Sequence, residues 1–308
     1  MAFNVKTMPE HKLSIAGCGY IGKKIARLLM AKNRQPDCFV LSKHSKKTCE
    51  SIGLNANRLD LDMPDMDMPD MDGVESNNTF ENSSIAYLVA PPAQGRTDTR
   101  MQHFISMLEK KSIAPEKIIL ISTTGIYGDC NGRWIDETQA EKPQADRAYR
   151  RLSAESQLKK YCKTSQVKYI ILRVPGIYAA DRLPLQRITS GKPIVKAENS
   201  GYTNRIHADD LAAFCVEALV SSIEQGIYNC CDGHPSTMHD YFTRVADAMG
   251  LARPDEISLQ QAQQELSAGM LSYLAESKRI SNKKLLKHFK TELRYPDLTS
   301  GLKNLNLN

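Results

Sequence analysis

The 308-residue sequence has no apolar run that approaches the roughly 18 residues needed to cross a bilayer, so no membrane-spanning helix is expected. The first twelve residues lack an apolar segment, so no secretory signal is expected either. The eight cysteines form no C-x-x-C pair, and Cys230 and Cys231 are adjacent, which argues against a disulfide framework or a structural zinc site. Reduced thiols in a cytoplasmic protein are the simplest interpretation.

An excess of one charge sign is also missing. The chain has 41 Lys and Arg residues against 35 Asp and Glu residues, and the net charge of +6 is spread along its length. This balance gives little indication of a nucleic-acid partner, and none is expected. With 41% hydrophobic and 25% charged residues, the composition is that of a globular protein and excludes a mainly disordered or fibrous chain. The length predicts one large or two modest domains.

Short apolar runs alternate with helical patterns, which predicts an α/β fold: a doubly wound parallel sheet with helices on both faces. Strands are expected at 13–16, 38–41, 57–61, 85–90, 117–121 and 169–174, and helices at 23–31, 100–110 and 155–163. Beyond residue 174 the segments become shorter and more polar. We therefore expect a first domain at 1–176 and a smaller C-terminal α/β substrate-binding part at 177–308, from which about 206–231 returns to the main sheet.

Residues 60–72 (DLDMPDMDMPDMD) form the only low-complexity stretch. Two prolines and alternating acidic residues predict a surface loop. So many carboxylates leave a calcium site open as an alternative. The spacing is not that of an EF-hand, however, and no glycine or terminal glutamate completes one, so no metal is expected.

The first expected strand leads directly into a G-x-G-x-x-G turn, Gly17-Cys18-Gly19-Tyr20-Ile21-Gly22, which opens the first helix. Gly17 permits the tight turn, Gly19 lets a pyrophosphate approach the backbone, and Gly22 lets the helix pack closely on the strand. The helix N-terminus offers N–H groups and a partial positive charge to phosphates. The pattern predicts a Rossmann-type dinucleotide site in the first domain; a glycine turn without a ligand is the alternative.

The second strand is not followed by the acidic residue that commonly binds the ribose 2′-OH of NAD. Ser42, Lys43 and His44 occupy that position, with Lys46 and Lys47 close behind. An acidic residue would repel a 2′-phosphate, whereas Lys43 would attract it. NADP is therefore favoured over NAD as the cofactor, and a solvated basic loop is the alternative.

Six further motifs follow in order: 118–128 (IILISTTGIYG), 134–137 (WIDE), 172–178 (LRVPGIY), 205–212 (RIHADDLA), 226–229 (GIYN) and 277–282 (SKRISN). Together with the glycine turn, they resemble the extended short-chain dehydrogenase/reductase superfamily, in particular its NAD-dependent epimerase/dehydratase branch. The chain looks most like an atypical bacterial subgroup often named for nucleoside-diphosphate-sugar epimerases. The resemblance implies hydride transfer with NAD(P) on a small polar substrate, either sugar-like or anionic. It also implies a homodimer, with a monomer as the alternative.

The resemblance implies catalysis by a Ser or Thr, a Tyr and a Lys. The lysine lowers the pKa of the tyrosine, which exchanges a proton with the substrate hydroxyl while a hydride moves to or from nicotinamide. Thr123 takes the Ser or Thr position, four residues before Tyr127. A strand-end hydroxyl bonded to the backbone is the alternative role of Thr123.

The family's Tyr-x-x-x-Lys pair is missing. Arg147 stands at the tyrosine position and Arg151 at the lysine position, and a guanidinium is a poor general acid or base. Tyr149 lies two residues later, about 200° around a helix, and would need a shifted backbone to replace the tyrosine. Arg147 and Arg151 are candidates for binding an anionic substrate or the cofactor phosphates. An exposed basic helix face is the alternative.

The resemblance also assigns Ala90, Pro91 and Pro92, after the fourth strand, and Pro175 and Ile177, beside the nicotinamide, to the cofactor site. Tyr127, Arg182 and Arg205 are candidates for contacting the substrate, with surface exposure as the alternative for Arg182.

Thr203 stands where nucleotide-sugar epimerases often carry an arginine that binds the diphosphate, so a nucleotide sugar is not favoured. Arg205 is the candidate substitute for that arginine. His207 is expected to be a packed, hydrogen-bonded residue rather than a catalyst. Basic residues near the C-terminus predict a solvated helix face, formed by Lys278, Arg279, Lys283, Lys284, Lys287 and Lys290.

Two functions stay open from the sequence. The first is an NADP-dependent oxidoreductase or epimerase-like enzyme. The second is a non-catalytic NADP(H)-binding sensor or scaffold, which the missing Tyr-x-x-x-Lys pair favours.

Overall fold

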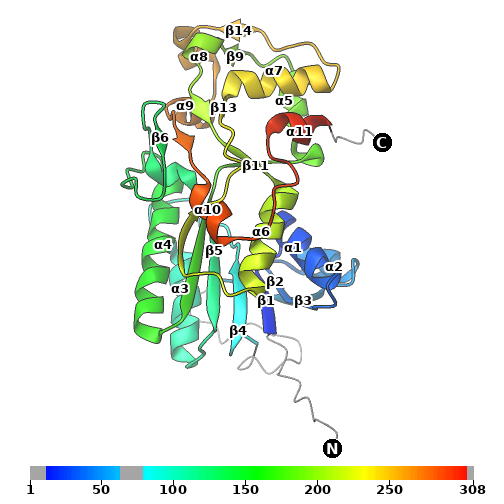
Figure 1. Ribbon diagram of the computed structural model, residues 1–308, viewed down its shortest axis with the longest axis vertical. Helices are drawn as coiled ribbons and strands as arrows, with labels where there is room; N and C mark the ends of the chain where they lie inside the picture. Colours follow the sequence, from blue (N-terminus) through cyan, green and yellow to red (C-terminus); the bar gives the residue numbers. More distant parts are fainter. Residues whose placement is uncertain (1–11, 63–78, 304–308) are drawn as a thin grey trace, which may run out of the picture.

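The computed structural model describes residues 12–62 and 79–303. Seven strands form its central sheet: β1 (Lys12–Ala16), β2 (Asp37–Val40), β3 (Asn55–Arg58), β4 (Ser83–Tyr87), β5 (Lys117–Thr123), β7 (Lys168–Val174) and β12 (Gly226–Asn229). All are parallel, in the order β12-β7-β5-β4-β1-β2-β3 (Figure 1).

Helices cover both faces of this sheet. On one face lie α1 (Tyr20–Met30), α2 (Lys43–Glu50) and α6 (Ala208–Val220), and on the other lie α3 (Thr99–Lys110) and α4 (Asp146–Ser165). Neighbouring residues of β1 show the division, because Ile15 packs with α1 and α6, whereas Ala16 packs with α3 and α4. The predicted doubly wound α/β arrangement is confirmed.

The remaining elements are short. The strands among them are β6 (Trp134–Ile135), β8 (Gly176–Tyr178), β9 (Ile194–Val195), β10 (Tyr202–Thr203), β11 (Arg205–His207), β13 (Ser236–Thr237), β14 (Glu256–Ile257) and β15 (Arg279–Ile280). The α-helices are α5 (Leu185–Thr189), α7 (Met238–Ala248), α8 (Leu259–Glu265), α9 (Ala268–Leu274), α10 (Lys283–His288) and α11 (Leu298–Lys303). The 3₁₀ helices are η1 (Thr124–Tyr127), η2 (Ala180–Arg182) and η3 (Ala197–Asn199). The short strands pair as β10 with β13, β11 with β8, β14 with β9 and β15 with β6.

Element boundaries differ from the sequence expectations in a few places. The third strand is Asn55–Arg58 rather than 57–61, and α4 begins at Asp146, well before residue 155. Residues 43–47 belong to α2 and not to a loop, because Ser42 caps this helix by accepting a hydrogen bond from the Ser45 amide. Residues 63–72 of the acidic low-complexity stretch lie outside the described residues. None of the helices in 12–62 and 79–303 has the length and apolar character of a bilayer crossing.

The strand order turns back at β1: β2 and β3 follow on one side, and β4 and β5 on the other. The connections that leave the carboxyl ends of β1 and β4 therefore diverge. In open parallel sheets, this divergence creates the crevice in which ligands bind. The loops after β1, β4 and β5 are thus the expected place for a site.

Candidate functional site

The turn after β1 depends on two of its glycines. Gly17 has φ of +87°, and a Cβ at this position would lie 2.7 Å from the backbone nitrogen of Val89. A Cβ on Gly22 would lie 3.2 Å from Cγ2 of Ile15. Gly17 therefore allows the β1 and β4 loops to approach, and Gly22 allows α1 to pack on β1.

The N-terminus of α1 has no side-chain cap, because its N-cap residue is Gly19. The amides of Gly17 and Cys18 both donate to the carbonyl of Phe39, which fixes the turn to β2. An uncapped helix leaves its first-turn N–H groups available to an anion. The buried Cys18 lies in this turn, whereas Tyr20 and Ile21 begin the helix.

A cavity of about 300 Å³ opens beside this turn, and we call it the glycine-turn cavity. It is lined by Gly17, Cys18, Gly19, Phe39, Val40, Leu41, Ser45, Leu59, Leu61, Leu88, Val89, Ala90 and Arg100. Ser42, Lys43 and His44 do not line it. They are exposed at the start of α2, between the lining residues Leu41 and Ser45.

Arg100, which the sequence reasoning did not single out, forms one wall of the glycine-turn cavity. Its guanidinium donates to the carbonyl of Ala90 at 2.9 Å and to both carboxylate oxygens of Asp62 at 2.6 Å. The hydrogen bonds from Arg100 hold the pKa of Asp62 below its usual value. The pair joins α3 to the segment after β3 at the edge of the cavity.

A second cavity, of about 340 Å³, lies at the carboxyl end of β5, and we call it the β5 cavity. It is lined by Pro91, Thr123, Thr124, Gly125, Arg147, Arg151, Pro175, Gly176, Tyr202, Thr203, Asn204, Tyr273, Glu276 and Lys278. The fold thus brings together five residues singled out from the sequence, namely Pro91, Thr123, Arg147, Arg151 and Pro175.

Thr123 lies where β5 ends and η1 begins. Its Oγ1 accepts a hydrogen bond from the amide of Gly125 at 3.2 Å, so it caps the 3₁₀ turn while it lines the β5 cavity. The backbone bond occupies one acceptor site of the hydroxyl. The hydroxyl proton remains available to a ligand oxygen.

Arg147 and Arg151 stand one turn apart on α4 but have different surroundings. Arg147 donates from Nη1 to the hydroxyl of Ser272 at 2.6 Å and lies 4.2 Å above the ring of Tyr273. No carboxylate lies within ion-pair distance of Arg147 among the described residues. Arg151 donates to the carbonyl of Val89 at 3.1 Å and lies 4.0 Å from Asp98, and burial lowers its pKa. Arg147 is therefore the guanidinium better placed to receive an anion.

The two tyrosines named from the sequence lie outside the β5 cavity. Tyr149 does not line this cavity, and the guanidinium of Arg96 stacks on its ring at 4.4 Å. Tyr127 is fully buried and donates to Oδ1 of Asn229 at 2.8 Å, and burial raises its pKa to about 12. The phenols that line this cavity belong instead to Tyr202 and Tyr273.

Arg182 and Arg205 do not reach the β5 cavity either. Arg182 is exposed and lies 4.1 Å from the ring centre of Tyr20. Arg205 is buried, donates to the hydroxyls of Thr203 and Ser236 at 2.9 and 3.0 Å, and stacks on Tyr241 at 3.9 Å. Burial lowers the pKa of Arg205. The structure thus gives Arg205 a packing role between β11 and α7.

Two further candidate residues flank the cavities without lining them. Pro92 lines neither cavity, and Ile177, 38% exposed, pairs with Ile206 where β8 meets β11. His207 is packed, as expected: its Nδ1 accepts from the amide of Asp209 and its ring stacks on Tyr295.

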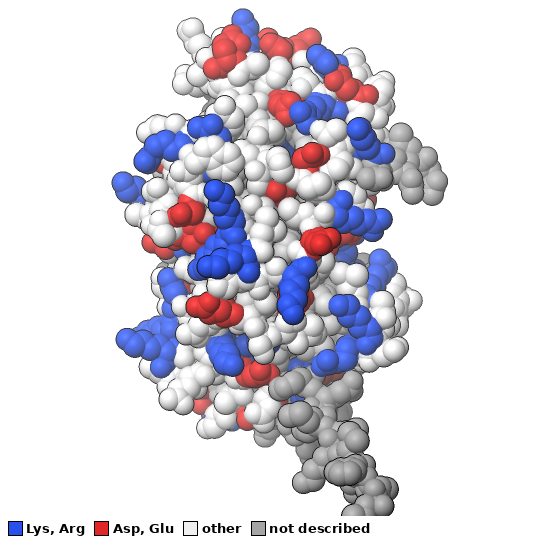
Figure 2. Space-filling view, in the orientation of Figure 1, with Lys and Arg blue, Asp and Glu red and all other residues white. Residues whose placement is uncertain are grey.

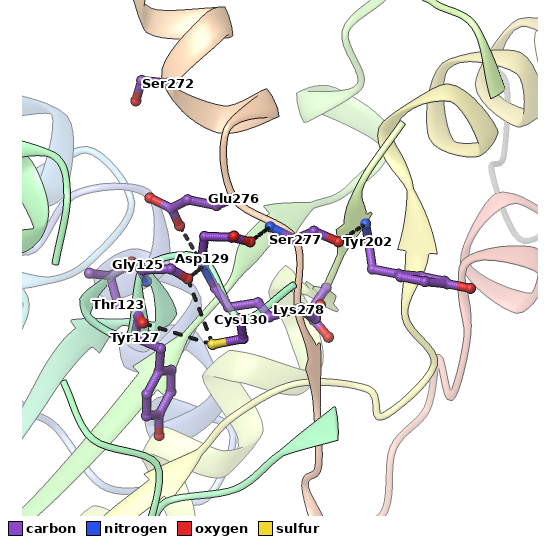
Figure 3. Close-up of polar contacts among 12 residues, drawn as sticks. Thr123, Gly125, Tyr127, Asp129, Cys130, Tyr202, Ser272, Glu276, Ser277 and Lys278 are labelled. Atoms are coloured by element: carbon purple, nitrogen blue, oxygen red, sulfur yellow. Dashed lines mark hydrogen bonds and ion pairs between the residues drawn. The ribbon is translucent and has the colours of Figure 1, made fainter. Parts of the chain in front are cut away.

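The sequence reasoning missed the wall that residues 276–278 contribute to the β5 cavity. Lys278 is buried, donates from Nζ to the carbonyl of Gly128 at 2.7 Å and forms an ion pair with Oε2 of Glu276. Oδ1 of Asp129 accepts from the amide of Ser277 at 2.8 Å. Figure 3 shows this segment beside the loop that follows η1.

The basic helix near the C-terminus is shorter than the sequence predicts. Lys278 and Arg279 precede it and Lys290 follows it, because α10 spans only Lys283–His288. Arg279 lies instead between the rings of Trp134 and Tyr202, at 5.7 and 4.7 Å. Figure 2 shows acidic and basic side chains interspersed on this face of the molecule, as the even spread of charge along the sequence predicts.

The family model described as "NAD dependent epimerase/dehydratase family" matches residues 14–231. The chain belongs to this family.

Among solved structures, a conserved protein of unknown function from Silicibacter pomeroyi is 23% identical with a TM-score of 0.78, over 96% of this chain and 98% of that one. The UDP-glucose 4-epimerase of Thermus thermophilus, in complex with NAD, is 19% identical with a TM-score of 0.71, over 95% and 96%. That of Thermotoga maritima, with UDP-glucose, is 16% identical with a TM-score of 0.73, over 95% and 96%. Comparison with curated protein sequences gives no match.

Proposed function

We propose that this chain is an NAD(P)-dependent oxidoreductase, related in mechanism to the epimerases, that acts by hydride transfer on a small anionic substrate carrying a hydroxyl group. The observation that carries the proposal is the relation of the two cavities. Val89 and Ala90 line the glycine-turn cavity, and the next residue, Pro91, lines the β5 cavity. The two cavities therefore meet along the loop after β4, as two halves of one dinucleotide site would.

The residues present fit a dinucleotide. A pyrophosphate would lie against the uncapped N-terminus of α1, where Gly19 leaves room for it. The adenosine half would occupy the glycine-turn cavity and the nicotinamide half the β5 cavity, beside Pro175. The nicotinamide supplies a hydride acceptor or donor, and the similar Thermus thermophilus structure carries NAD in its complex.

NADP is the cofactor that the charges favour. Lys43 is exposed at the start of α2, three residues after the end of β2, and no acidic residue occupies positions 41–49. A 2′-phosphate at this place gains a favourable charge interaction with Lys43, whereas an acidic residue would repel it.

Arg147 supports an anionic substrate, because its guanidinium lines the β5 cavity without a carboxylate partner among the described residues. Thr123 would donate its hydroxyl proton to the substrate oxygen. A nucleotide sugar is not favoured, since Arg205 is buried against Tyr241 rather than turned to the cavity. In this proposal residues 1–176 bind the cofactor and residues 177–308 mainly form the substrate side, with about 206–231 rejoining the sheet.

One observation favours the alternative of a non-catalytic NADP(H)-binding protein: position 147 holds an arginine, and Tyr149 does not line the β5 cavity. The first test is a fluorescence titration of the purified protein with NADPH and with NADH. We expect NADPH to bind more tightly than NADH, and Lys43→Asp to weaken NADPH binding about tenfold or more. Lys32→Asp, at an exposed lysine just after α1, should leave it unchanged. Binding of neither nucleotide would contradict the proposal.

A turnover screen separates the enzyme from the sensor. The protein with NADP⁺ is incubated with hydroxy acids, sugar acids and sugars, and formation of NADPH is followed by its absorbance. Turnover that falls in Arg147→Met supports the enzyme. Intact NADPH binding with no turnover on any compound supports the sensor.

A further inference from the structure

Only one of the two carboxylate oxygens of Glu276 has a partner in the surrounding protein. The side chain is only 10% exposed, and Oε2 forms the ion pair with Lys278. Oε1 is buried and has no hydrogen-bond partner among the described residues. Burying a carboxylate oxygen without a hydrogen-bond partner costs folding free energy, so the position of Oε1 calls for an explanation.

The carboxylate is fixed firmly in the wall of the β5 cavity. Lys278 holds Oε2 and is itself anchored on the carbonyl of Gly128. The carbonyl of the next residue, Ser277, accepts backbone hydrogen bonds from Cys130 and Gly132 at 3.1 and 2.9 Å. The Ser277 amide donates to Asp129 (Figure 3). Glu276 therefore has a fixed position in the wall of the cavity that Thr123 and Arg147 also line.

This cavity needs a group that takes a proton from the substrate hydroxyl. Arg147 and Arg151 stay protonated and cannot do so. Lys278 is held as an ion pair, and the phenols of Tyr202 and Tyr273 belong to side chains that are 39% and 53% exposed. Glu276 is the one carboxylate among the described residues that line the cavity, and glutamate is a common general base.

We propose that Glu276 is the proton acceptor of this site, in place of the tyrosine that the family uses, and that Lys278 is its positioning residue. In the oxidative direction, the hydroxyl O–H bond breaks and its proton goes to Oε1 of Glu276. The carbinol C–H bond would break as the C=O bond forms, and a bound oxidised nicotinamide would supply the acceptor for the hydride. The two electrons that the alcohol loses would leave with that hydride. The reverse reaction returns the proton from the carboxylic acid. This inference rests on the proposed function.

The test uses the full-length protein saturated with NADP⁺ and three probe sets: D- and L-lactate with propionate, D- and L-malate with succinate, and D-gluconate with hexanoate. Saturation-transfer NMR measures the affinity for each acid, which gives a readout independent of turnover. At least one hydroxy acid should bind about fivefold tighter than the acid without the hydroxyl, as one charge-assisted hydrogen bond allows. In Glu276→Gln this ratio should fall below about two, because a neutral amide is the weaker acceptor.

Turnover of the same acid should fall about a hundredfold or more in Glu276→Gln, while NADPH affinity stays unchanged. Glu256→Gln is the matched control, because this half-exposed carboxylate is paired with His239 and lines neither cavity. If Glu276→Gln fails to fold, Glu276→Asp keeps the charge beside Lys278 and withdraws the oxygens from the cavity. It should lower the same ratio.

Three results overturn the inference. The first is a binding ratio and a turnover in the Glu276 variants within twofold of the parent protein. The second is that no acid of the three sets binds to a protein that does bind NADPH, in which case the proposed nucleotide site stands. The third is that NADPH itself does not bind, in which case the proposed function fails as well.

Discussion

Removing the side chain of Glu155 tests how α4 is fixed to the sheet beneath the β5 cavity. Glu155 on α4 and Arg173 on β7 are both fully buried and form a two-point ion pair, with distances of 2.8 and 3.1 Å. Ser122 on β5 donates to the same carboxylate at 2.5 Å. Glu141, whose side chain is 36% exposed, is the second carboxylate on Arg173, at 2.7 Å.

Removing Glu155 should cost far more unfolding free energy than removing Glu141. Glu155→Ala leaves the buried guanidinium with only the outer partner, and breaking a buried pair in this way costs about 3–5 kcal/mol of unfolding free energy. Glu141→Ala removes a partly solvated partner and should cost about 1 kcal/mol or less. Replacing Glu155 and Arg173 together by leucine should cost less than Glu155→Ala alone, because no unpaired charge is then buried.

Equilibrium unfolding in urea, followed by far-UV circular dichroism at pH 7, measures all these variants under one condition. Glu155→Ala should lower the midpoint several times more than Glu141→Ala does. The reasoning is refuted if the two single variants lose the same stability, since the fully buried pair would then contribute no more than the outer one.

Three further predictions concern the turn, the pH dependence and α4. Gly17→Ala should abolish measurable NADPH fluorescence enhancement and lower the melting temperature, because the residue has positive φ and its Cβ would meet Val89; unchanged binding would contradict the turn geometry. Burial lowers the pKa of His207 from 6.5 to about 4, so the unfolded chain takes up the proton first and stability is lost as the pH falls from 6.5 toward 4. His207→Asn keeps a cap on α6 and should remove that part of the loss, on the order of 2 kcal/mol, in urea midpoints compared at pH 7 and pH 4.5. Tyr149→Phe should leave NADPH affinity and turnover within about twofold, whereas Arg147→Met should weaken binding of an anionic substrate about tenfold, as calorimetry would show.

The features that the sequence predicted are set by local patterns. The glycine turn follows from the conformations that only glycine adopts easily, and its place after a strand follows from the apolar run before it. The placing of Arg147 and Arg151 on one face of α4, with Tyr149 on the other, follows from 3.6 residues per turn. Helix periodicity alone therefore separated the two arginines of the β5 cavity from the tyrosine that lies outside it.

The features that the sequence did not predict depend on distant pairing. Glu276 and Lys278 reach the β5 cavity because β15 pairs with β6, about 145 residues earlier in the chain. The local sequence pattern around 276–278 does not predict that pairing. Tyr127 was expected to face the substrate, but the 3₁₀ turn of η1 directs its ring into the core beside Arg173. Arg205 likewise finds partners on a later helix.

The joining of β15 to β6 also sets an order of events during synthesis. Every residue that lines the glycine-turn cavity has been synthesised by Arg100, whereas the β5 cavity waits for Lys278. The lining of the glycine-turn cavity is therefore present in the growing chain well before the lining of the β5 cavity is. The β5 cavity gains its last wall only when the segment that carries Glu276 and Lys278 docks on the loop after η1.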